Sequence, residues 1–181
     1  NILRHDPDVI LIGEIRDHET ANIAVESALT GHLVLSTLHT NDAPGAVTRL
    51  LEMGIETYLL NGSLLGVLAQ RLVRKNCPHC LEIEPVDIMI RQTLGLEGDE
   101  VFYHGVGCEQ CHQTGISGRV AVYELLSVND DIRKVISSDV DTTEIYKQAK
   151  KQGLVTLTEN ALMRAKSKEI SLAEVYRVRL D

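Results

Sequence analysis

The chain of 181 residues contains no tryptophan and one phenylalanine, so aromatic side chains can contribute little to its core. With 44% hydrophobic residues it still has a globular composition, and its core must be built from aliphatic side chains. No apolar run reaches the roughly 18–20 residues that a membrane-spanning helix needs, so we expect a soluble chain without a transmembrane segment.

Basic residues are also in deficit, with 18 Lys and Arg against 26 Asp and Glu and a net charge of −8. This balance argues against binding to the phosphate backbone of nucleic acids as the main function. The sequence has no initiating methionine and reaches a strand-like segment within its first ten residues. We therefore expect a fragment of a longer protein, whose upstream parts would not be visible here.

Two short apolar segments predict neighbouring strands of a parallel sheet. Val9–Ile12 is rich in β-branched residues and lies between Pro7 and Gly13, which is typical of a strand buried on both faces. Leu33–Leu35 begins a second segment of this kind. Apolar residues at helical spacing lie between them and predict a connecting helix: Ala21, Ala24, Val25 and Ala28.

Ionisable residues follow both predicted strands of this βαβ unit. Glu14 comes directly after the first strand, and His39 follows the second. In open α/β sheets ligands bind at the carboxyl ends of the strands, so these two residues are candidates for chemistry. Each also has a simpler explanation, because a strand-end Glu14 can pair with Arg16 and a loop histidine can bond to backbone groups.

A further helix is predicted over 43–53, with capping side chains from Asn41 and Asp42 and a C-terminal glycine at Gly54. The sequence then predicts a helix over 57–69 and short strands over 71–73 and 119–125. The remaining helices are expected at 130–137, 141–151, 156–168 and from Ser171, where Ser171 and Glu174 have the spacing of a capping box.

Composition divides the chain into three parts. Residues 1–73 have the pattern of an α/β domain, whereas 74–118 hold all four cysteines, with little periodicity. Residues 119–181 return to a strand and then to helices. We expect the end of an α/β domain, a small cysteine-bearing subdomain and a helical C-terminal subdomain.

The cysteines form two C-x-x-C pairs, Cys77 with Cys80 and Cys108 with Cys111, separated by residues 81–107. Two such pairs complete the four-sulfur tetrahedral shell that zinc favours. A complete shell leaves no open coordination position, so the predicted zinc site is structural rather than catalytic.

Three other uses of these cysteines fit the sequence less well. A thioredoxin-like redox pair at Cys77–Cys80 should open a helix, but Pro85 lies in the segment that follows. The sequence Cys108-Glu-Gln-Cys111-His112 matches a c-type haem attachment pattern, which leaves the first pair unexplained. Structural disulfides would require secretion, for which the sequence gives no sign.

The segment from Asp8 to Asp17 and the segment from Thr30 to Asp42 resemble the Walker B and histidine boxes of the secretion ATPases that power type II secretion and type IV pilus assembly. The two cysteine pairs and the following Gly118-Arg119 resemble the metal-binding insertion of the assembly branch, which retraction motors generally lack. The resemblance covers essentially the whole chain. It implies the C-terminal half of a RecA-like ATPase core within a cytoplasmic homo-hexamer, docked peripherally on an inner-membrane platform protein.

The resemblance also implies roles for individual residues. Glu14 matches the Walker B glutamate, which acts on water linked to Mg²⁺, and His39 matches the residue that senses the γ-phosphate of ATP. His32 belongs to the same histidine box. Arg16 lies beside Glu14 and is expected to pair with it or with another acidic neighbour.

The chain departs from this family in one respect, because it contains no Gly-x-x-x-x-Gly-Lys-Ser/Thr motif. The backbone cradle and lysine that hold the phosphates are therefore missing, and the family places them upstream. The complete protein is expected to hydrolyse ATP with Mg²⁺, and the chain alone is expected to be inactive.

Two alternatives to a protein-transport motor remain open. A non-enzymatic zinc-ribbon adaptor could use the α/β part as a scaffold for binding a protein, but it would have no use for Glu14 and His39. A nucleic-acid translocase on the same ATPase fold is opposed by the acidic composition. Secretion and pilus assembly are not distinguished by these motifs.

Overall fold

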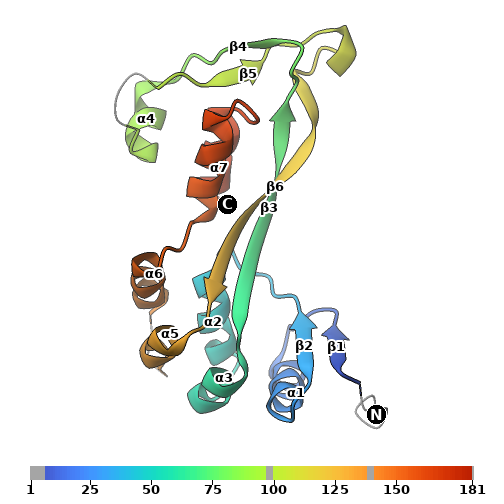
Figure 1. The fold of residues 1–181 in the computed structure, drawn as a ribbon, viewed down its shortest axis with the longest axis vertical. Helices are drawn as coiled ribbons and strands as arrows, with labels where there is room; N and C mark the ends of the chain where they lie inside the picture. The colour runs from blue at the N-terminus through green and yellow to red at the C-terminus, as the bar shows by residue number, and fades with distance from the viewer. Residues whose placement is uncertain (1–6, 97–99, 138–140, 181) are drawn as a thin grey trace. The chain divides into compact units, whose positions relative to one another are not determined.

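The computed structural model describes residues 7–96, 100–137 and 141–180 and has an α/β fold (Figure 1). It contains two compact units, each assembled from two separated parts of the chain. Unit 1 comprises the described parts of Asn1–Ala69 and Leu125–Leu154, and unit 2 those of Gln70–Glu124 and Val155–Asp181. The division by composition into 1–73, 74–118 and 119–181 stays a prediction, and residues 1–6 of its first part lie outside the described residues.

Unit 1 begins with the expected βαβ unit, formed by β1 (Val9–Ile12), α1 (His18–Leu29) and β2 (Leu33–Ser36). The two strands pair in parallel, from Val9 opposite Leu33 to Ile12 opposite Ser36. Asp17 caps α1, because its side chain accepts a hydrogen bond from the Thr20 N–H at 2.8 Å. These findings confirm the parallel pair and the connecting helix.

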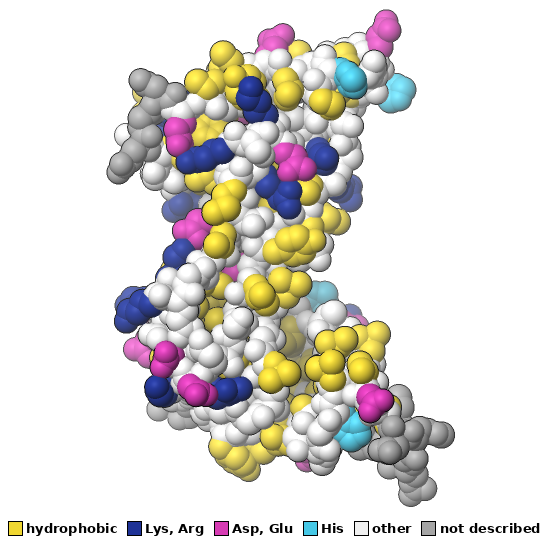
Figure 2. All heavy atoms as spheres, in the orientation of Figure 1, with side chains coloured by type: hydrophobic (Ala, Val, Ile, Leu, Met, Phe, Trp, Pro, Cys, Tyr) yellow, Lys and Arg dark blue, Asp and Glu magenta, His cyan; other side chains and the backbone are white. Residues whose placement is uncertain are grey.

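The expected burial of β1 on both faces is wrong. Ile10 is buried, whereas Leu11 is 73% exposed. The register places Val9 and Leu11 beside Leu33 and Leu35, so the outward side chains of both strands form one apolar surface (Figure 2). The physical reason is that this sheet has two strands and α1 packs against one of its faces.

The helix α2 (Ala43–Glu52) follows β2 and matches its prediction closely. The Asp42 carboxylate accepts a hydrogen bond from the Gly45 N–H at 2.7 Å, and Pro44 lies in the first turn. Gly54 has a φ of +91°, a left-handed conformation that favours glycine after a helix. Both ends of this helix are therefore encoded locally.

The helix predicted over 57–69 ends early. The structure has α3 (Thr57–Ser63) and then β3 (Gly66–Asn76), which is much longer than the strand predicted over 71–73. Its partner β6 (Ile116–Ser127) likewise extends beyond the predicted 119–125. The two strands form a two-stranded sheet, and this non-local pairing decides the conformation of residues for which local propensity is ambiguous.

Two helices complete unit 1, α5 (Asp130–Val135) and α6 (Thr142–Lys151). The predicted helix over 130–137 thus ends at Val135, and residues 138–140 lie outside the described part of the chain. Helix α6 packs against both α2 and α5. The buried aliphatic core of this unit includes Val25, Val47, Leu50, Leu60, Ile132 and Ile145.

Unit 2 contains a small hairpin of β4 (Leu81–Ile83) and β5 (Tyr103–Gly105), paired antiparallel, with α4 (Ile88–Leu94) between them in sequence. A single 3₁₀ turn, η2 (Glu109–Cys111), follows. Two packed helices close the unit, α7 (Leu157–Lys166) and α8 (Leu172–Leu180). The core here includes Phe102, Val122, Ala161, Ala165, Ile170 and Val175.

Helix α8 begins where predicted, but the capping box is only half formed. The Ser171 hydroxyl accepts a hydrogen bond from the Glu174 N–H at 3.4 Å. The Glu174 carboxylate is instead held by Arg74, and the first-turn N–H groups of Leu172 and Ala173 donate to the Glu84 carboxylate. The carboxylate of Glu84, which is distant in sequence, therefore replaces part of the local cap. It accepts hydrogen bonds from N–H groups of the first turn that have no partner within the helix.

No helix in the described ranges combines the length and the apolar content needed to cross a membrane.

Candidate functional site

Three of the predicted site residues meet at the carboxyl edge of the parallel strands in unit 1. Glu14 follows β1, and its Oε2 accepts a hydrogen bond from Arg16 Nε at 2.6 Å. His39 follows β2, and its Nε2 lies 3.4 Å from the same carboxylate oxygen. Because the strands are parallel and in register, residues that follow each strand by two or three positions come to the same edge.

The side chains of this strand-end group are open to solvent, at 38% for Glu14, 71% for Arg16 and 82% for His39. Exposed ion pairs contribute little to folding stability. The arrangement therefore suits a role toward a ligand better than a role in holding the fold. A carboxylate with an imidazole beside it can orient a water molecule and donate a hydrogen bond to an anion.

The backbone beneath this group is fixed by Thr37, the first residue after β2. Its carbonyl oxygen accepts a hydrogen bond from the Ile15 N–H at 2.9 Å, and its hydroxyl donates to the Gly13 carbonyl at 2.7 Å. The pairing of the two strands thus continues beyond the sheet, up to the residues that carry Glu14 and His39. Thr37 is not among the site residues predicted from the sequence.

The structure does not bring His32 to this group. His32 directly precedes β2, so it lies at the opposite end of the strand from His39. Its Nδ1 lies 2.9 Å from the Ser27 carbonyl and 3.2 Å from the Thr30 hydroxyl, which ties it to the end of α1. Within this chain, His32 has the contacts of a residue that satisfies backbone groups.

The four cysteines of unit 2 form one cluster, with all four Sγ atoms within 4.8 Å of one another. The distances are 3.9 Å for Cys77–Cys108, 3.9 Å for Cys80–Cys111 and 3.7 Å for Cys108–Cys111. Four sulfur atoms held about 2.3 Å from one zinc ion in a tetrahedron would be separated by about 3.8 Å. The donor set and its spacing therefore fit a four-thiolate zinc site.

None of these cysteines forms a disulfide, and Cys80 is followed by β4 rather than by a helix. Both observations favour a metal site over the disulfide and thioredoxin-like alternatives. Cys108 and Cys111, the pair that matches the haem attachment pattern, both belong to the same cluster as Cys77 and Cys80, as a four-thiolate site requires.

Backbone N–H groups point at the cluster, as they do in sites that stabilise thiolates. Gly107 donates to Cys80 Sγ at 3.3 Å, and Cys108 and Gly115 each donate to Cys111 Sγ at 3.2 Å. Burial raises the pKa of Cys111, but these two N–H donors, together with hydrogen bonds from the Cys108 and Cys80 side chains, outweigh it and bring that pKa to about 6. Burial raises the pKa of Cys80 to about 11, and a zinc ion bound here would require its thiolate form.

Two glycines allow the chain to close around this cluster. A Cβ placed on either Gly105 or Gly115 would come within 2.0 Å of the carbonyl oxygen of the other. Gly115 also has a φ of +71°, and its carbonyl accepts a hydrogen bond from the Cys77 N–H at 2.8 Å. The two cysteine pairs are thereby joined through a contact that only glycine permits.

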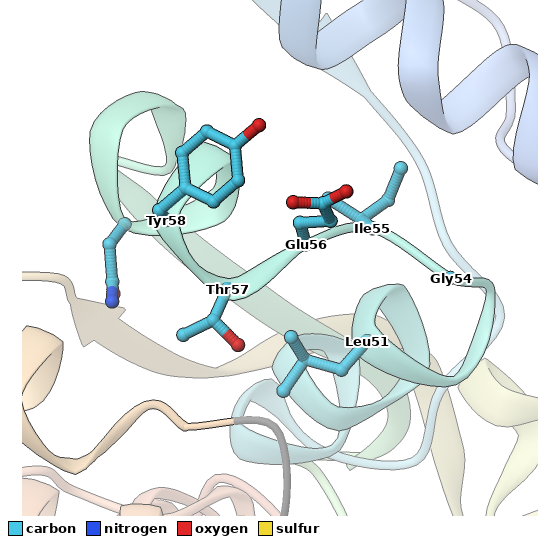
Figure 3. A pocket seen from close by; sticks show the side chains of 7 residues that line it. Leu51, Gly54, Ile55, Glu56, Thr57 and Tyr58 are labelled. Atoms are coloured by element: carbon cyan, nitrogen blue, oxygen red, sulfur yellow. The ribbon is translucent and has the colours of Figure 1, made fainter.

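A pocket of about 630 Å³ lies elsewhere in unit 1, around the loop between α2 and α3 (Figure 3). Its residues are Leu51, Gly54, Ile55, Glu56, Thr57, Tyr58 and Asn61. The lining contains neither the residues of the strand-end group nor the cysteines, so this pocket is separate from both candidate sites.

Comparison with known proteins places the whole chain among secretion proteins. The family model described as type II/IV secretion system protein matches residues 1–177. The type IV pilus assembly ATPase TfpB of Acinetobacter baylyi is 45% identical over 181 residues, covering 98% of this chain and 31% of TfpB. The type IV pilus assembly ATPase PilB of Thermus thermophilus is 51% identical over 178 residues, covering 96% of this chain and 20% of PilB.

The putative type II secretion system protein E of Escherichia coli is 48% identical over 179 residues, covering 98% of this chain and 36% of that protein. The chain thus spans between 20% and 36% of the length of these three relatives. Relatives named for secretion and relatives named for pilus assembly match equally well.

Solved structures show the same fold. The crystal structure of the pilus retraction motor PilT with bound ADP matches with a TM-score of 0.67 and 28% identity, covering 99% of this chain and 42% of that one. The ATPase DotB of Legionella pneumophila matches with a TM-score of 0.65 at 23% identity, covering 99% of this chain and 40% of that one. The second likeness concerns the fold alone.

Proposed function

The chain belongs to the family of type II/IV secretion system proteins, and we propose that it is part of a hexameric ATPase that powers type II secretion or type IV pilus assembly. The relatives it resembles are named as ATPases of pilus assembly and as type II secretion proteins. The single observation that supports hydrolysis most strongly is the meeting of Glu14, Arg16 and His39 at the carboxyl edge of two parallel strands.

Glu14 is proposed as the catalytic carboxylate of this ATPase. In the complete protein it would orient the attacking water and would help to hold Mg²⁺, which would supply charge stabilisation when bound, since phosphoryl transfer depends mainly on positioning and on charge stabilisation. Its carboxylate is 38% exposed and therefore accessible to water. The backbone next to it is held by the hydrogen bond from the Ile15 N–H to the Thr37 carbonyl.

His39 is proposed to sense the γ-phosphate through an imidazole N–H. At 3.4 Å from Glu14 it lies close enough that one water molecule can contact both side chains. Arg16 is proposed to set the position of Glu14 through their hydrogen bond. His32, at the other end of β2, is proposed only as a residue that supports the histidine-bearing segment.

The phosphates of ATP require a cradle that this chain does not contain, because the sequence has no phosphate-binding loop. We propose that ATP and Mg²⁺ bind only when the chain is joined to such a loop. The 181-residue chain by itself then hydrolyses no ATP, whereas the complete protein does. A chain that hydrolysed ATP alone, and lost this activity on changing Glu14, would contradict this division.

The four-cysteine cluster is proposed to hold one structural Zn²⁺. When bound, the ion cross-links the segments that carry the two cysteine pairs. Four thiolates leave no position for water, so the ion takes no part in hydrolysis.

The complete protein is proposed to work in the cytoplasm at the inner membrane, as a homo-hexamer on a platform protein of the secretion or pilus machine. The secretion or pilus machine is supported by the names of the relatives and by family membership, whereas the hexamer, the platform protein and the location rest on the resemblance of the sequence motifs to secretion ATPases. Hydrolysis by the complete protein tests it against the adaptor alternative. An adaptor would bind zinc and show no turnover that depends on Glu14.

A further inference from the structure

Thr37 contacts the backbone on both sides of Glu14. The Gly13 carbonyl belongs to the peptide group before Glu14, and it accepts a hydrogen bond from the Thr37 hydroxyl at 2.7 Å. The Ile15 N–H belongs to the peptide group after Glu14, and it donates to the Thr37 carbonyl at 2.9 Å. One residue of the β2 segment therefore holds both peptide groups that adjoin the Glu14 Cα.

This arrangement fixes the direction in which the Glu14 side chain leaves the backbone. Peptide groups are planar, so holding the groups on both sides of a residue restricts its φ and ψ together. The Cα–Cβ bond of Glu14 then has one direction relative to the end of β2. Because only Leu38 separates Thr37 from His39, the same two bonds also set the spacing between Glu14 and His39.

A substitution at position 37 can remove one of these two hydrogen bonds but not the other. The Ile15 N–H bond uses the Thr37 backbone, which any residue at this position supplies. The bond to Gly13 requires a hydroxyl on the side chain. Valine has the same branched shape as threonine but no donor, whereas serine retains the donor with less bulk.

We propose that Thr37 is a positioning residue for hydrolysis, whose hydroxyl holds the Glu14 carboxylate in the geometry needed toward His39 and the reacting water. This inference rests on the proposed ATPase function. It assigns to Thr37 no contact with nucleotide. Its effect is on the rate of the chemical step, since a displacement of a catalytic group by about 1 Å can cost up to about a hundredfold in rate.

The first test measures amide hydrogen exchange at Ile15 in the complete protein. Thr37→Val is expected to speed exchange at Ile15 about fivefold, which is the effect of losing one hydrogen bond of ordinary strength. Thr37→Ser is expected to stay close to wild type. Unchanged exchange in Thr37→Val would overturn the inference that the hydroxyl holds this segment.

The second test measures ATP turnover by the complete protein. Thr37→Val is expected to lower kcat about tenfold or more and to leave KM for ATP within about twofold, and Thr37→Ser to restore kcat. Thr143→Val makes the same chemical change at an exposed position in the first turn of α6 and is the control. Equal loss in the valine and serine variants, or no loss in either, would overturn the positioning role.

The two proposals fail in different ways. Turnover that is independent of Glu14 would contradict the ATPase function, whatever Thr37 does. Glu14-dependent turnover with wild-type kcat in Thr37→Val would leave the ATPase function intact and overturn the role of Thr37. Slower turnover together with faster exchange at Ile15, both reversed by serine, is the result that supports the inference.

Discussion

His39 Nε2 lies 3.4 Å from Glu14 Oε2, although the two residues belong to different strand ends and the helix α1 separates those strands in sequence. The parallel pairing of β1 and β2 in register places them together. Arg16 adds a cation to the same carboxylate oxygen at 2.6 Å. The group therefore combines a carboxylate, a guanidinium and an imidazole at one edge of the sheet, where α/β proteins bind their ligands.

Replacing Arg16 is expected to affect activity much more than stability. Arg16→Leu removes an exposed partner of Glu14, and exposed ion pairs contribute about 0–1 kcal/mol, so the melting temperature should change little. Turnover by the complete protein should nevertheless fall, because Glu14 loses the group that sets its position. Steady-state ATP hydrolysis and thermal unfolding measure the two effects.

Arg49→Leu is the matched control for Arg16, since Arg49 and Glu52 form an exposed pair in the same unit. Both variants should melt near the wild-type temperature, and only the Arg16 variant should lose turnover. A large loss of stability in Arg16→Leu would contradict the functional reading of the strand-end group.

The cysteine cluster is expected to bind one zinc ion per chain. Cys108→Ser should abolish stoichiometric zinc and loosen the hairpin of unit 2, because three remaining thiolates no longer complete the tetrahedron. Metal analysis of the purified protein measures the first effect, and proteolysis or hydrogen exchange around β4 and β5 measures the second.

His112→Ala provides the control for this change, since His112 follows the second cysteine pair but lies outside the cluster. It should retain zinc. The zinc assignment is wrong if wild-type protein contains no stoichiometric metal. Loss of metal on changing His112 would show that the ligand set is not four thiolates.

The Arg74–Glu174 pair is expected to stabilise unit 2. The Glu174 side chain is 4% exposed and accepts hydrogen bonds from both the backbone N–H and the Nε of Arg74, at 2.9 and 2.8 Å. Arg74→Ala would leave a buried carboxylate without its main partner, at a cost of about 3 kcal/mol in the free energy of unfolding. Urea denaturation measures this cost.

Arg177 also contacts Glu174, at 3.4 Å, but its own side chain is 53% exposed. Arg177→Ala should therefore cost no more than about 1 kcal/mol. Equal costs in the two arginine variants would contradict the assignment of the main stabilising contact to Arg74.

The stability of unit 2 should decrease in acid because of the same pair. Burial raises the pKa of Glu174, but hydrogen bonds and charge from Arg74 outweigh it and hold that pKa below its ordinary value. A carboxyl whose pKa is lower in the folded state stabilises the fold above its unfolded pKa. This contribution is lost as the pH falls through the lowered folded pKa.

Unfolding free energies measured between neutral and acidic pH check this expectation. Wild type should lose stability over the acidic range, and Glu174→Gln should lose less over the same range because it has no proton to take up. Parallel pH profiles for the two proteins would show that Glu174 does not contribute to the acid sensitivity.

The parallel strands, α1, α2 and the cysteine cluster could be predicted because local signals specify them. Asp17 and Asp42 cap their helices by accepting hydrogen bonds from N–H groups three residues further along the chain. The C-x-x-C spacing of the cysteines is itself typical of a zinc site. The meeting of Glu14 and His39 followed from the parallel arrangement of the strands.

Other features depend on distant partners and could not be predicted. The segment that begins at Gly66 is a strand because it pairs with β6, although its apolar residues also suit a helix. Glu174 has the spacing of a capping box, yet the buried Arg74 contact takes its carboxylate. Thr37 gave no signal, since a threonine after a strand has no motif that reveals its bond to Gly13.

The most direct test of the central claim is ATP hydrolysis by the complete protein, comparing wild type with Glu14→Gln. Glutamine keeps the shape of the side chain and removes its charge. The account predicts that nucleotide binding persists while turnover falls by several hundredfold or more, on the order of what the loss of a key charge-stabilising group costs. Equal turnover in the two proteins would contradict it.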